Sequence, residues 1–411
     1  KMIFMKILLK NCRYILTQNK NRDILENQSI LIEENKISKI SKSIKGNFDE
    51  IIDCSKKLVM PGLINCHTHV AMTLMRGIAD DMNLEDFLKK TFRLDKEMDK
   101  DKVKKGAEIG IIEMIKSGTT CFQDLYYYEN VVAEVAEKFG MRAVLAWAVL
   151  DKEYTTQKGE PLKNAIKFSK SIKSELIKPA FGLQGVYVCS KETFEKSKKY
   201  ANEKKLLLHM HLSETRKEVE EHIKKTGKSP TKWLYEIGFL SENLSAAHCV
   251  WLTDEEIKML NEKNVSVVHC PSSNLKLASG CMPWKEMKKF GVNISLGTDG
   301  CASNNNLDMF EEMHISALIH KYASMDARVA NAQEILDSAT IFGAKALKIN
   351  SGSVEEGKLA DLITLDISDL RWFPLNKNTL ISHIVYSINS SCVIDSIING
   401  KIIMRERKIL K

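Results

Sequence analysis

Two histidines, His67 and His69, stand two residues apart at the end of an apolar, β-prone segment that begins at Val59. Side chains alternate between the two faces of a strand, so residues at positions i and i+2 point the same way. Both imidazoles can therefore reach one metal ion. A His-x-His pair alone is weak support, because two neighbouring histidines are more often surface residues or hydrogen-bonded core residues.

Further polar side chains follow later apolar segments in the chain. His211 and Glu214 follow one such segment, His248 ends another, and Asp299 lies in Gly297-Thr-Asp-Gly after a third. Each has a structural interpretation: His248 as a core histidine, Asp299 as a turn residue, and Glu214 as a first-turn helix residue near the helix dipole. Their joint occurrence at the ends of successive strand-like segments is much harder to explain by structure alone.

Three imidazoles and a carboxylate are ligands typical of Zn²⁺ or Fe²⁺, whereas Ca²⁺ and Mg²⁺ prefer oxygen atoms. We therefore expect a divalent metal, with Zn²⁺ first and Fe²⁺ second. A site with few protein ligands leaves a position for water, whose pKa such an ion lowers to about 7. His209 shares a strand face with His211 and is an alternative ligand.

The elements that must position these residues alternate between strand and helix from about residue 59 to 350. The strand-like segments are the one that ends at His67 and those at residues 120–124, 143–149, 180–186, 206–211, 245–248, 265–269 and 292–299. Amphipathic helical segments lie between them, for example at residues 101–117, 130–139, 191–203 and 254–262. Eight such units predict an α/β protein with a (β/α)8 TIM barrel, whose active site lies at the carboxyl ends of its strands.

Both ends of the chain lack this alternation of strand and helix. Short β-prone segments separated by Asn- and Asp-rich turns fill residues 5–58, and similar segments return after residue 351. Asn399-Gly400 between two apolar segments predicts a tight hairpin. We expect residues 1–58 and 351–411 to form one small, β-sandwich-like domain, and residues 59–350 to form the barrel domain.

Composition excludes several classes of protein. In 411 residues, 44% are hydrophobic and 28% charged, as in globular proteins. The net charge of +8 comes from dispersed lysines, so we expect no nucleic-acid partner. The apolar segment 143–150 is far shorter than the roughly 18 residues of a membrane span, so we expect no membrane partner. Ten cysteines without a C-x-x-C motif predict reduced thiols and a cytoplasmic protein.

A set of motifs resembles the amidohydrolase superfamily, and within it the 5'-methylthioadenosine/S-adenosylhomocysteine deaminase family, which includes 5'-deoxyadenosine deaminases. These motifs lie at residues 61–69, 72–77, 211–215, 246–250, 271–277 and 296–305, and residues 353–362 are similar to the segment where such chains leave the barrel. The resemblance runs nearly from end to end.

This resemblance implies a mononuclear metal site. Its ligands would be His67, His69, His211 and Asp299. The family pattern His-x-x-Glu selects His211 over His209. A binuclear amidohydrolase needs a carboxylated lysine at the end of strand 4, and the segment Leu183-Gln-Gly-Val-Tyr contains none.

The resemblance also implies a reaction, the hydrolytic deamination of adenine to hypoxanthine in 5'-modified adenosines, with release of ammonia. Glu214 would carry a proton to the purine ring nitrogen, while His248 and Asp299 would hold and deprotonate the attacking water. Expected substrates are 5'-deoxyadenosine and 5'-methylthioadenosine, with S-adenosylhomocysteine and adenosine as further candidates, and a homo-oligomer is expected. The alternatives are a guanine or triazine deaminase, a chlorohydrolase, or an inactive ligand-binding barrel.

Some positions depart from the family pattern. Where the family has a glutamate for the ribose hydroxyls, this chain offers Asp95, which we favour, or Lys96 or Glu97. Gln184 stands where the family has a histidine that contacts the nucleoside. The amide of Gln184 can donate and accept hydrogen bonds, but unlike a histidine it cannot become charged. Trp147 stands where some members have an arginine that meets the carboxylate of S-adenosylhomocysteine. The loss of this arginine favours substrates with small or apolar 5' groups. A tryptophan at this position can also serve only to pack the barrel.

Overall fold

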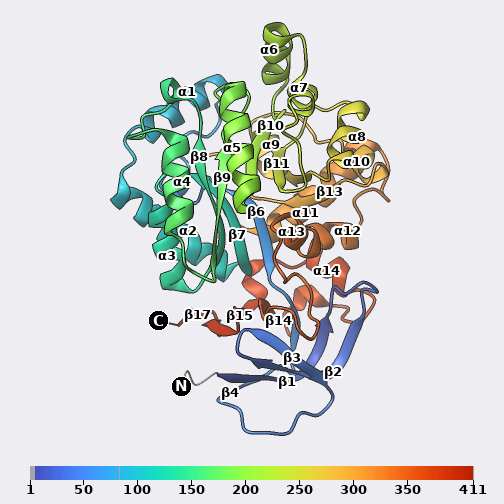
Figure 1. Ribbon diagram of the computed structural model, residues 1–411. Helices are drawn as coiled ribbons and strands as arrows, with labels where there is room; N and C mark the ends of the chain where they lie inside the picture. The colour runs from blue at the N-terminus through green and yellow to red at the C-terminus, as the bar shows by residue number, and fades with distance from the viewer. Residues whose placement is uncertain (1–4, 83, 411) are drawn as a thin grey trace.

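The computed structural model describes residues 5–82 and 84–410. Eight parallel strands form one sheet in chain order and curve into a nearly closed barrel (Figure 1). They are β6 (Leu63–Thr68), β7 (Thr119–Tyr126), β8 (Arg142–Val149), β9 (Ile177–Leu183), β10 (Leu207–Leu212), β11 (Leu244–His248), β12 (Ser266–His269) and β13 (Asn293–Leu296). The predicted (β/α)8 fold is confirmed.

Helices surround these strands because strands of a parallel sheet are covered on both faces. Every residue of β6, β7 and β10 is buried. The helices are α1 (Leu84–Asp95), α2 (Lys100–Lys116), α3 (Glu129–Phe139), α4 (Pro161–Ser171), α5 (Lys191–Lys204), α6 (Arg216–Thr226), α7 (Pro230–Glu236), α8 (Asp254–Glu262), α9 (Pro271–Lys276), α10 (Trp284–Lys289), α11 (Met309–Ser324), α12 (Ala332–Ala339), α13 (Ile341–Ala346) and α14 (Leu380–Tyr386). Among the described residues, none of these helices combines the length and the apolar character needed to cross a bilayer.

The barrel is closed between β6 and β13 by a short polar seam. The Asn65 amide donates to Thr298 Oγ1 (2.7 Å), and Thr298 N donates back to Asn65 Oδ1 (3.0 Å). Asp299 N donates to the carbonyl of His67 (2.9 Å). Gly297 allows this approach, since a Cβ there would lie 2.8 Å from the backbone nitrogen of His67. The first and last strands of the barrel are therefore held together directly at the candidate site.

The two ends of the chain share a second, nine-stranded mixed sheet. Its strands are β1 (Lys6–Leu16), β2 (Ile24–Glu33), β3 (Lys36–Ser41), β4 (Glu50–Asp53), β5 (Lys57–Pro61), β14 (Leu362–Asp366), β15 (Val393–Ile398), β16 (Lys401–Arg405) and β17 (Lys408–Ile409). Asn399 and Gly400, both at positive φ, form the predicted hairpin between β15 and β16.

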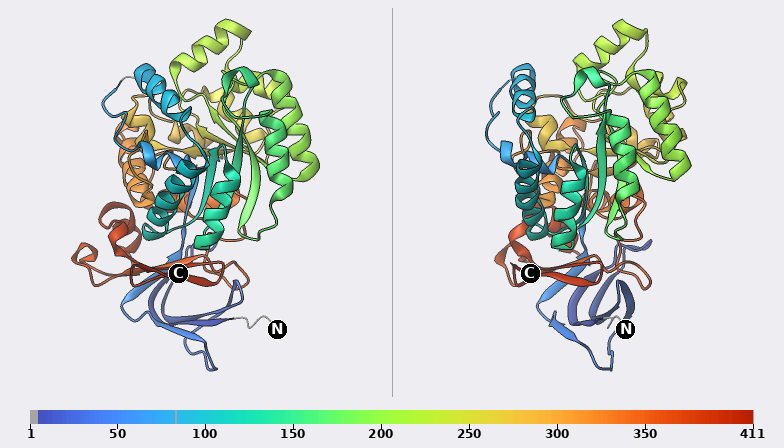
Figure 2. Two further views of the ribbon diagram at one scale, coloured as in Figure 1. Left: turned by 90° about the vertical axis from the view of Figure 1, so that its left-hand side faces the viewer. Right: turned by 60° about the vertical axis from the view of Figure 1, so that its left-hand side comes forward.

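This sheet lies at the amino-terminal end of the barrel strands, because β5 leads directly into β6 (Figure 1). Figure 2 shows the first and the last strands of the described chain, in dark blue and red, on this part of the molecule. Helix α14 packs against α11 and α12 of the barrel. The division into two domains at residues 58 and 351 stays a prediction.

A buried ion pair joins the barrel to the second sheet. Arg142, at the start of β8, donates to both carboxylate oxygens of Asp361 (2.7 and 3.1 Å) and to Asn399 Oδ1 (2.9 Å). The side chains of Arg142 and Asp361 are only 6% and 1% exposed. Two charges so deeply buried stabilise the fold only as a pair.

We expect Asp361→Asn to lower the free energy of unfolding by about 3 kcal/mol or more, because it leaves the buried guanidinium of Arg142 without its counter-charge. Denaturant-induced unfolding measures this. The control is Asp326→Asn, whose partner Arg328 is 90% exposed, and it should change stability by less than about 1 kcal/mol. Equal effects of the two substitutions would contradict the role given to the buried pair.

Candidate metal centre

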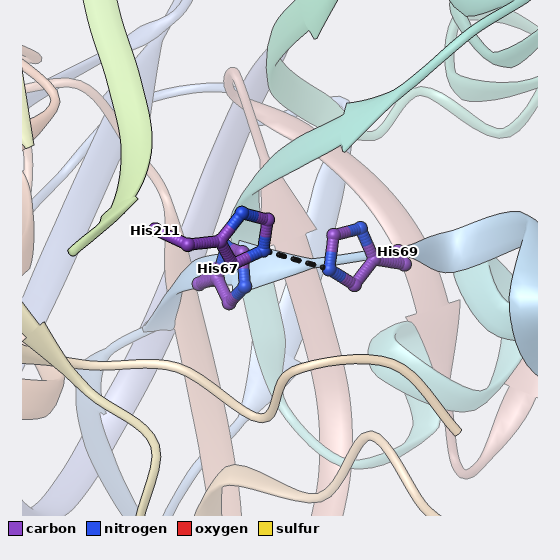
Figure 3. A group of neighbouring side chains, drawn as sticks. All are labelled: His67, His69 and His211. Atoms are coloured by element: carbon purple, nitrogen blue, oxygen red, sulfur yellow. Dashed lines mark hydrogen bonds between the residues drawn. The ribbon is translucent and has the colours of Figure 1, made fainter. Parts of the chain in front are cut away.

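Side chains from three barrel strands and from the segment after β13 converge at the carboxyl end of the barrel. His67 and His69 come from β6 and its end, and Figure 3 shows them beside His211 of β10. Two groups of three residues have potential ligand atoms that all lie within 4.8 Å of one another. The first group is His67, His69 and His211, and the second is His67, His248 and Asp299. All five lie where the sequence predicts the site.

The distances between these atoms are those of ligands around one ion. Asp299 Oδ1 lies 3.4 Å from His67 Nε2 and 3.3 Å from His69 Nε2, and His69 Nε2 lies 3.3 Å from His211 Nε2. Nitrogen ligands about 2.1 Å from a tetrahedral Zn²⁺ lie about 3.4 Å apart. These three distances are compatible with ligands of a single divalent ion, as the sequence predicts.

The orientation of the imidazoles supports the same conclusion. His69 Nδ1 donates to the carbonyl of Leu125 (2.6 Å), and His211 Nδ1 donates to the carbonyl of Gln184 (2.8 Å). A neutral imidazole with its proton on Nδ1 presents a lone pair on Nε2. The Nε2 atom of His67 is buried and has no hydrogen-bond partner among the described residues. The Nε2 atoms of His67, His69 and His211 are thus directed at one centre, while the Nδ1 atoms of His69 and His211 bond to backbone carbonyls.

Charge is distributed unevenly over the four residues. Burial lowers the pKa of His67 and of His211 well below the usual range, so both are neutral, as ligands must be. Burial alone would raise the pKa of Asp299, but the neighbouring imidazoles of His67 and His69 lower it well below its usual range. Burial likewise lowers the pKa of His69. The hydrogen bond to Asp299 and the charge of Asp299 have a larger effect and raise the pKa of His69 to about 9. A cation bound here would release this proton.

Residues that the sequence analysis did not single out hold Asp299 in place. Its Oδ2 accepts from Ser273 Oγ (2.6 Å) and Ser303 Oγ (2.8 Å), and its Oδ1 accepts from Gly300 N (2.8 Å). Both serines lie within motifs quoted for the family resemblance, at residues 271–277 and 296–305. That position was the available signal for their role.

His248 has a different environment from the three other histidines. The Asn274 amide donates to His248 Nδ1 (3.0 Å), which places the proton of neutral His248 on Nε2. That Nε2 lies 3.8 Å from Glu214 Oε2. His248 therefore presents a hydrogen-bond donor to the centre, whereas the other three present lone pairs.

Glu214 is held at the centre by a second glutamate, which sequence reasoning missed. Glu218, in the first turn of α6, accepts from the backbone nitrogens of Ser213 (3.2 Å) and Glu214 (2.9 Å). Burial raises the pKa of Glu214, and burial together with the charge of Glu214 raises the pKa of Glu218 to about 7. The only sequence signal was its place four residues after Glu214, at the start of a helix.

Residues 58–403 match the Amidohydrolase family. The chain belongs to the amidohydrolase family. A 5'-deoxyadenosine deaminase from Methanocaldococcus jannaschii is 42% identical over 411 residues, covering 98% of this chain and 95% of that one. A 5-methylthioadenosine/S-adenosylhomocysteine deaminase from Thermococcus sibiricus is 41% identical over 405 residues, covering 97% and 94%.

A solved structure agrees with these relatives. The crystal structure of an adenosine deaminase from Xanthomonas campestris with bound zinc superposes with a TM-score of 0.94 at 32% identity, covering 98% of this chain and 94% of that one. The resemblance to the amidohydrolase superfamily inferred from the motifs is therefore confirmed. A divalent metal in this amidohydrolase is supported by the donor set and by that zinc-bound structure.

The structure separates the three candidates for the ribose contact. Asp95, at the end of α1, accepts from the hydroxyl of Tyr126, and its carbonyl accepts from Tyr127 Oη (2.7 Å). Lys96 and Glu97 are exposed. Burial raises the pKa of Asp95, and His69 is among the charges that act on it in the opposite direction. That Asp95 binds the ribose of the substrate stays a prediction from the sequence of this amidohydrolase.

The other two departures from the family pattern are Trp147, in β8, and Gln184, directly after the neighbouring strand β9. The carbonyl of Gln184 accepts from His211, while its amide donates to Tyr187 Oη (3.4 Å). Trp147 Nε1 donates to Gln157 Oε1 (3.0 Å), and the Trp147 ring packs against Phe168 with 5.6 Å between ring centroids. Gln184 thus supports a candidate ligand through its backbone, and Trp147 is held by packing and a hydrogen bond.

We expect His211→Ala to abolish stable metal binding, because it removes one of the three imidazole lone pairs. The expected loss in zinc affinity exceeds about a hundredfold, more than the loss of a supporting residue costs. Zinc per subunit after dialysis, measured by mass spectrometry, checks this. His222→Ala, which removes a buried histidine bonded to the Lys228 carbonyl, should retain the metal. Full zinc occupancy in His211→Ala would exclude it as a ligand.

Proposed function

We propose that this amidohydrolase is a deaminase that converts the adenine of 5'-modified adenosines to hypoxanthine and releases ammonia. The observation that carries the proposal is the convergence of His67, His69, His211 and Asp299 at spacings compatible with one ion, with Glu214 near His248. The names of the relatives support adenosine derivatives as the substrate class. Small or apolar 5' groups are preferred in this proposal.

One Zn²⁺ ion, with Fe²⁺ as the second candidate, would be held by the same four residues. Such an ion lowers the pKa of water to about 7, so hydroxide is available at neutral pH. Imidazole nitrogens together with one carboxylate favour these metals over Ca²⁺ or Mg²⁺.

The chain's own groups suit the proton transfers that deamination requires. Hydroxide adds to C6 of the purine while the adjacent ring nitrogen gains a proton, and the amino group leaves as ammonia after gaining another. Burial raises the pKa of Glu214, so Glu214 holds a proton readily and delivers it to the ring nitrogen. His248 donates a hydrogen bond to the attacking oxygen through Nε2, and Asp299 accepts the proton that this oxygen loses.

Substrate binding involves Asp95 and Gln184 in this proposal. Asp95 accepts hydrogen bonds from the ribose hydroxyls, and the Tyr126 hydroxyl fixes its carboxylate. Gln184 offers an uncharged amide, and Trp147 offers no counter-charge for a carboxylate on the 5' substituent. Ten free cysteines among the described residues are compatible with a reducing cytoplasm, and a homo-oligomeric state is proposed as well.

We expect Glu214→Gln to lower kcat by about 10²- to 10⁴-fold, because an amide cannot carry the proton to the purine ring. Zinc content should stay unchanged, since Glu214 is not one of the four ligands. Ammonia release from 5'-deoxyadenosine measures the first effect, and metal analysis measures the second. Glu220→Gln, on the exposed side of α6, should keep full activity. A Glu214→Gln enzyme as active as the parent would remove Glu214 from the mechanism.

A substrate series distinguishes the proposal from its alternatives. We expect kcat/KM for 5'-deoxyadenosine and 5'-methylthioadenosine to exceed that for S-adenosylhomocysteine by about tenfold or more, since the carboxylate of the latter meets no arginine at the Trp147 position. A preference for S-adenosylhomocysteine would contradict the assigned specificity. Turnover of only guanine or a triazine would favour a guanine or triazine deaminase or a chlorohydrolase. A zinc-loaded protein that converts none of these compounds would favour an inactive ligand-binding barrel.

A further inference from the structure

A line of buried polar side chains runs behind His67, on the side away from the proposed ion. His67 Nδ1 lies 2.7 Å from His209 Nε2, and His209 Nδ1 lies 3.0 Å from the carbonyl oxygen of Ser245 and 2.8 Å from its Oγ. Ser245 Oγ donates onward to Gln123 Oε1 (3.0 Å). These four residues are at most 2% exposed. They come from β6, β10, β11 and β7, so the line crosses the barrel interior.

The direction of the protons along this line follows from its two ends. The Ser245 carbonyl can only accept, so His209 Nδ1 carries the proton in that bond. Within the described part of the chain, no carboxylate is hydrogen-bonded to His209, and an unpaired charge buried there would be costly. A neutral His209 then has a lone pair on Nε2, which accepts from His67 Nδ1–H.

Strand register keeps this arrangement rigid. His209 of β10 pairs directly with Ser245 of β11, so the accepting carbonyl belongs to the neighbouring strand at the same level. The His209 ring lies 4.9 Å from the His67 ring, centroid to centroid. His209 Nε2 is occupied by His67, and His209 belongs to neither group of potential ligands. The alternative ligand of the sequence analysis thus has another place in the structure.

We propose that His209 is a positioning residue that keeps the proton of His67 on Nδ1 and so aims the His67 Nε2 lone pair at the metal centre. Leu125 and Gln184 supply backbone carbonyls for this purpose to His69 and His211. His67 lacks such a carbonyl, and a side-chain imidazole takes its place. The inference rests on the proposed metal site and adds a requirement for an acceptor behind His67.

The test compares four variants of the full-length protein. In His209→Gln the amide oxygen can reach the position of Nε2 and accept from His67, whereas His209→Leu has no acceptor. His209→Asn retains a polar group near Nδ1 but has none at Nε2, and serves if the leucine variant fails to fold. His383→Leu is the control, since it removes a buried histidine bonded to the Pro374 carbonyl far from the site.

Zinc affinity, measured by competition with a chelator, is the first readout. We expect a loss of about 10- to 100-fold for the leucine and asparagine variants, recovery to within about threefold of the parent for His209→Gln, and no change for His383→Leu. The tautomer of His67 is the second readout, observed by long-range ¹H–¹⁵N spectra of histidine-labelled, metal-free protein. The parent, His209→Gln and His383→Leu should show the proton on Nδ1, and His209→Leu and His209→Asn should not.

Parental zinc affinity in a folded leucine or asparagine variant would overturn the inference, and so would equal losses in the glutamine and leucine variants. These outcomes leave the proposed function intact as long as the parent binds zinc and deaminates adenosine derivatives. A parent protein that binds no zinc would instead refute the proposed function itself.

Discussion

The direct contact between the first and last barrel strands is the constraint on which the candidate centre depends. His67 and His69 are fixed by the alternation of β6, but Asp299 lies more than 200 residues later in the chain. The bond from Asp299 N to the His67 carbonyl, the paired contacts of Asn65 with Thr298, and the absence of a side chain at Gly297 bring the two segments together. Any wider separation of β6 and β13 would move Asp299 Oδ1 away from both imidazoles.

Such a centre is costly to build, because it combines buried polar groups with an unfavourable backbone. Ser213, His248, Cys249 and Asp299, at the ends of β10, β11 and β13, all have positive φ. Non-glycine residues in this region cost about 1–3 kcal/mol each and persist only where the surroundings fix them. Here the rest of the scaffold compensates, through continuous apolar barrel layers and through buried pairs such as Arg142 with Asp361.

The fold and the positions of the three histidines could be predicted from the sequence, because both follow from local or periodic patterns. The segment that ends at His67 and the seven later strand-like segments correspond to β6–β13, and the predicted helix at residues 254–262 has the same bounds as α8. A Thr253–Glu256 capping box explains the sharp start of that helix. Strand alternation in turn placed His67, His69 and His211 on the inner surface of the barrel.

What the sequence could not supply are relations between distant segments. Ser273 and Ser303 contact Asp299 only after α9 and the segment after β13 are brought together, and the Tyr126 hydroxyl reaches Asp95 from another strand end. No local pattern encodes such pairs. The same holds for His209, since its alternation with His211 indicates a shared face but not that its Nε2 atom meets His67 Nδ1 of another strand.

The partner of each histidine's Nδ1 atom, more than the residue type, distinguishes the roles available at this centre. A carbonyl behind His69 and another behind His211 each accept a proton and leave a lone pair on Nε2. The Asn274 amide behind His248 donates instead, which leaves a proton on Nε2 directed toward Glu214. Because an imidazole with a proton on Nε2 cannot bind a cation through that atom, the same side chain is suited to be a ligand in one case and a hydrogen-bond donor in the other. Ligand identity in such a barrel is therefore decided by the surrounding strands and loops, and a histidine motif read without its neighbours cannot show it.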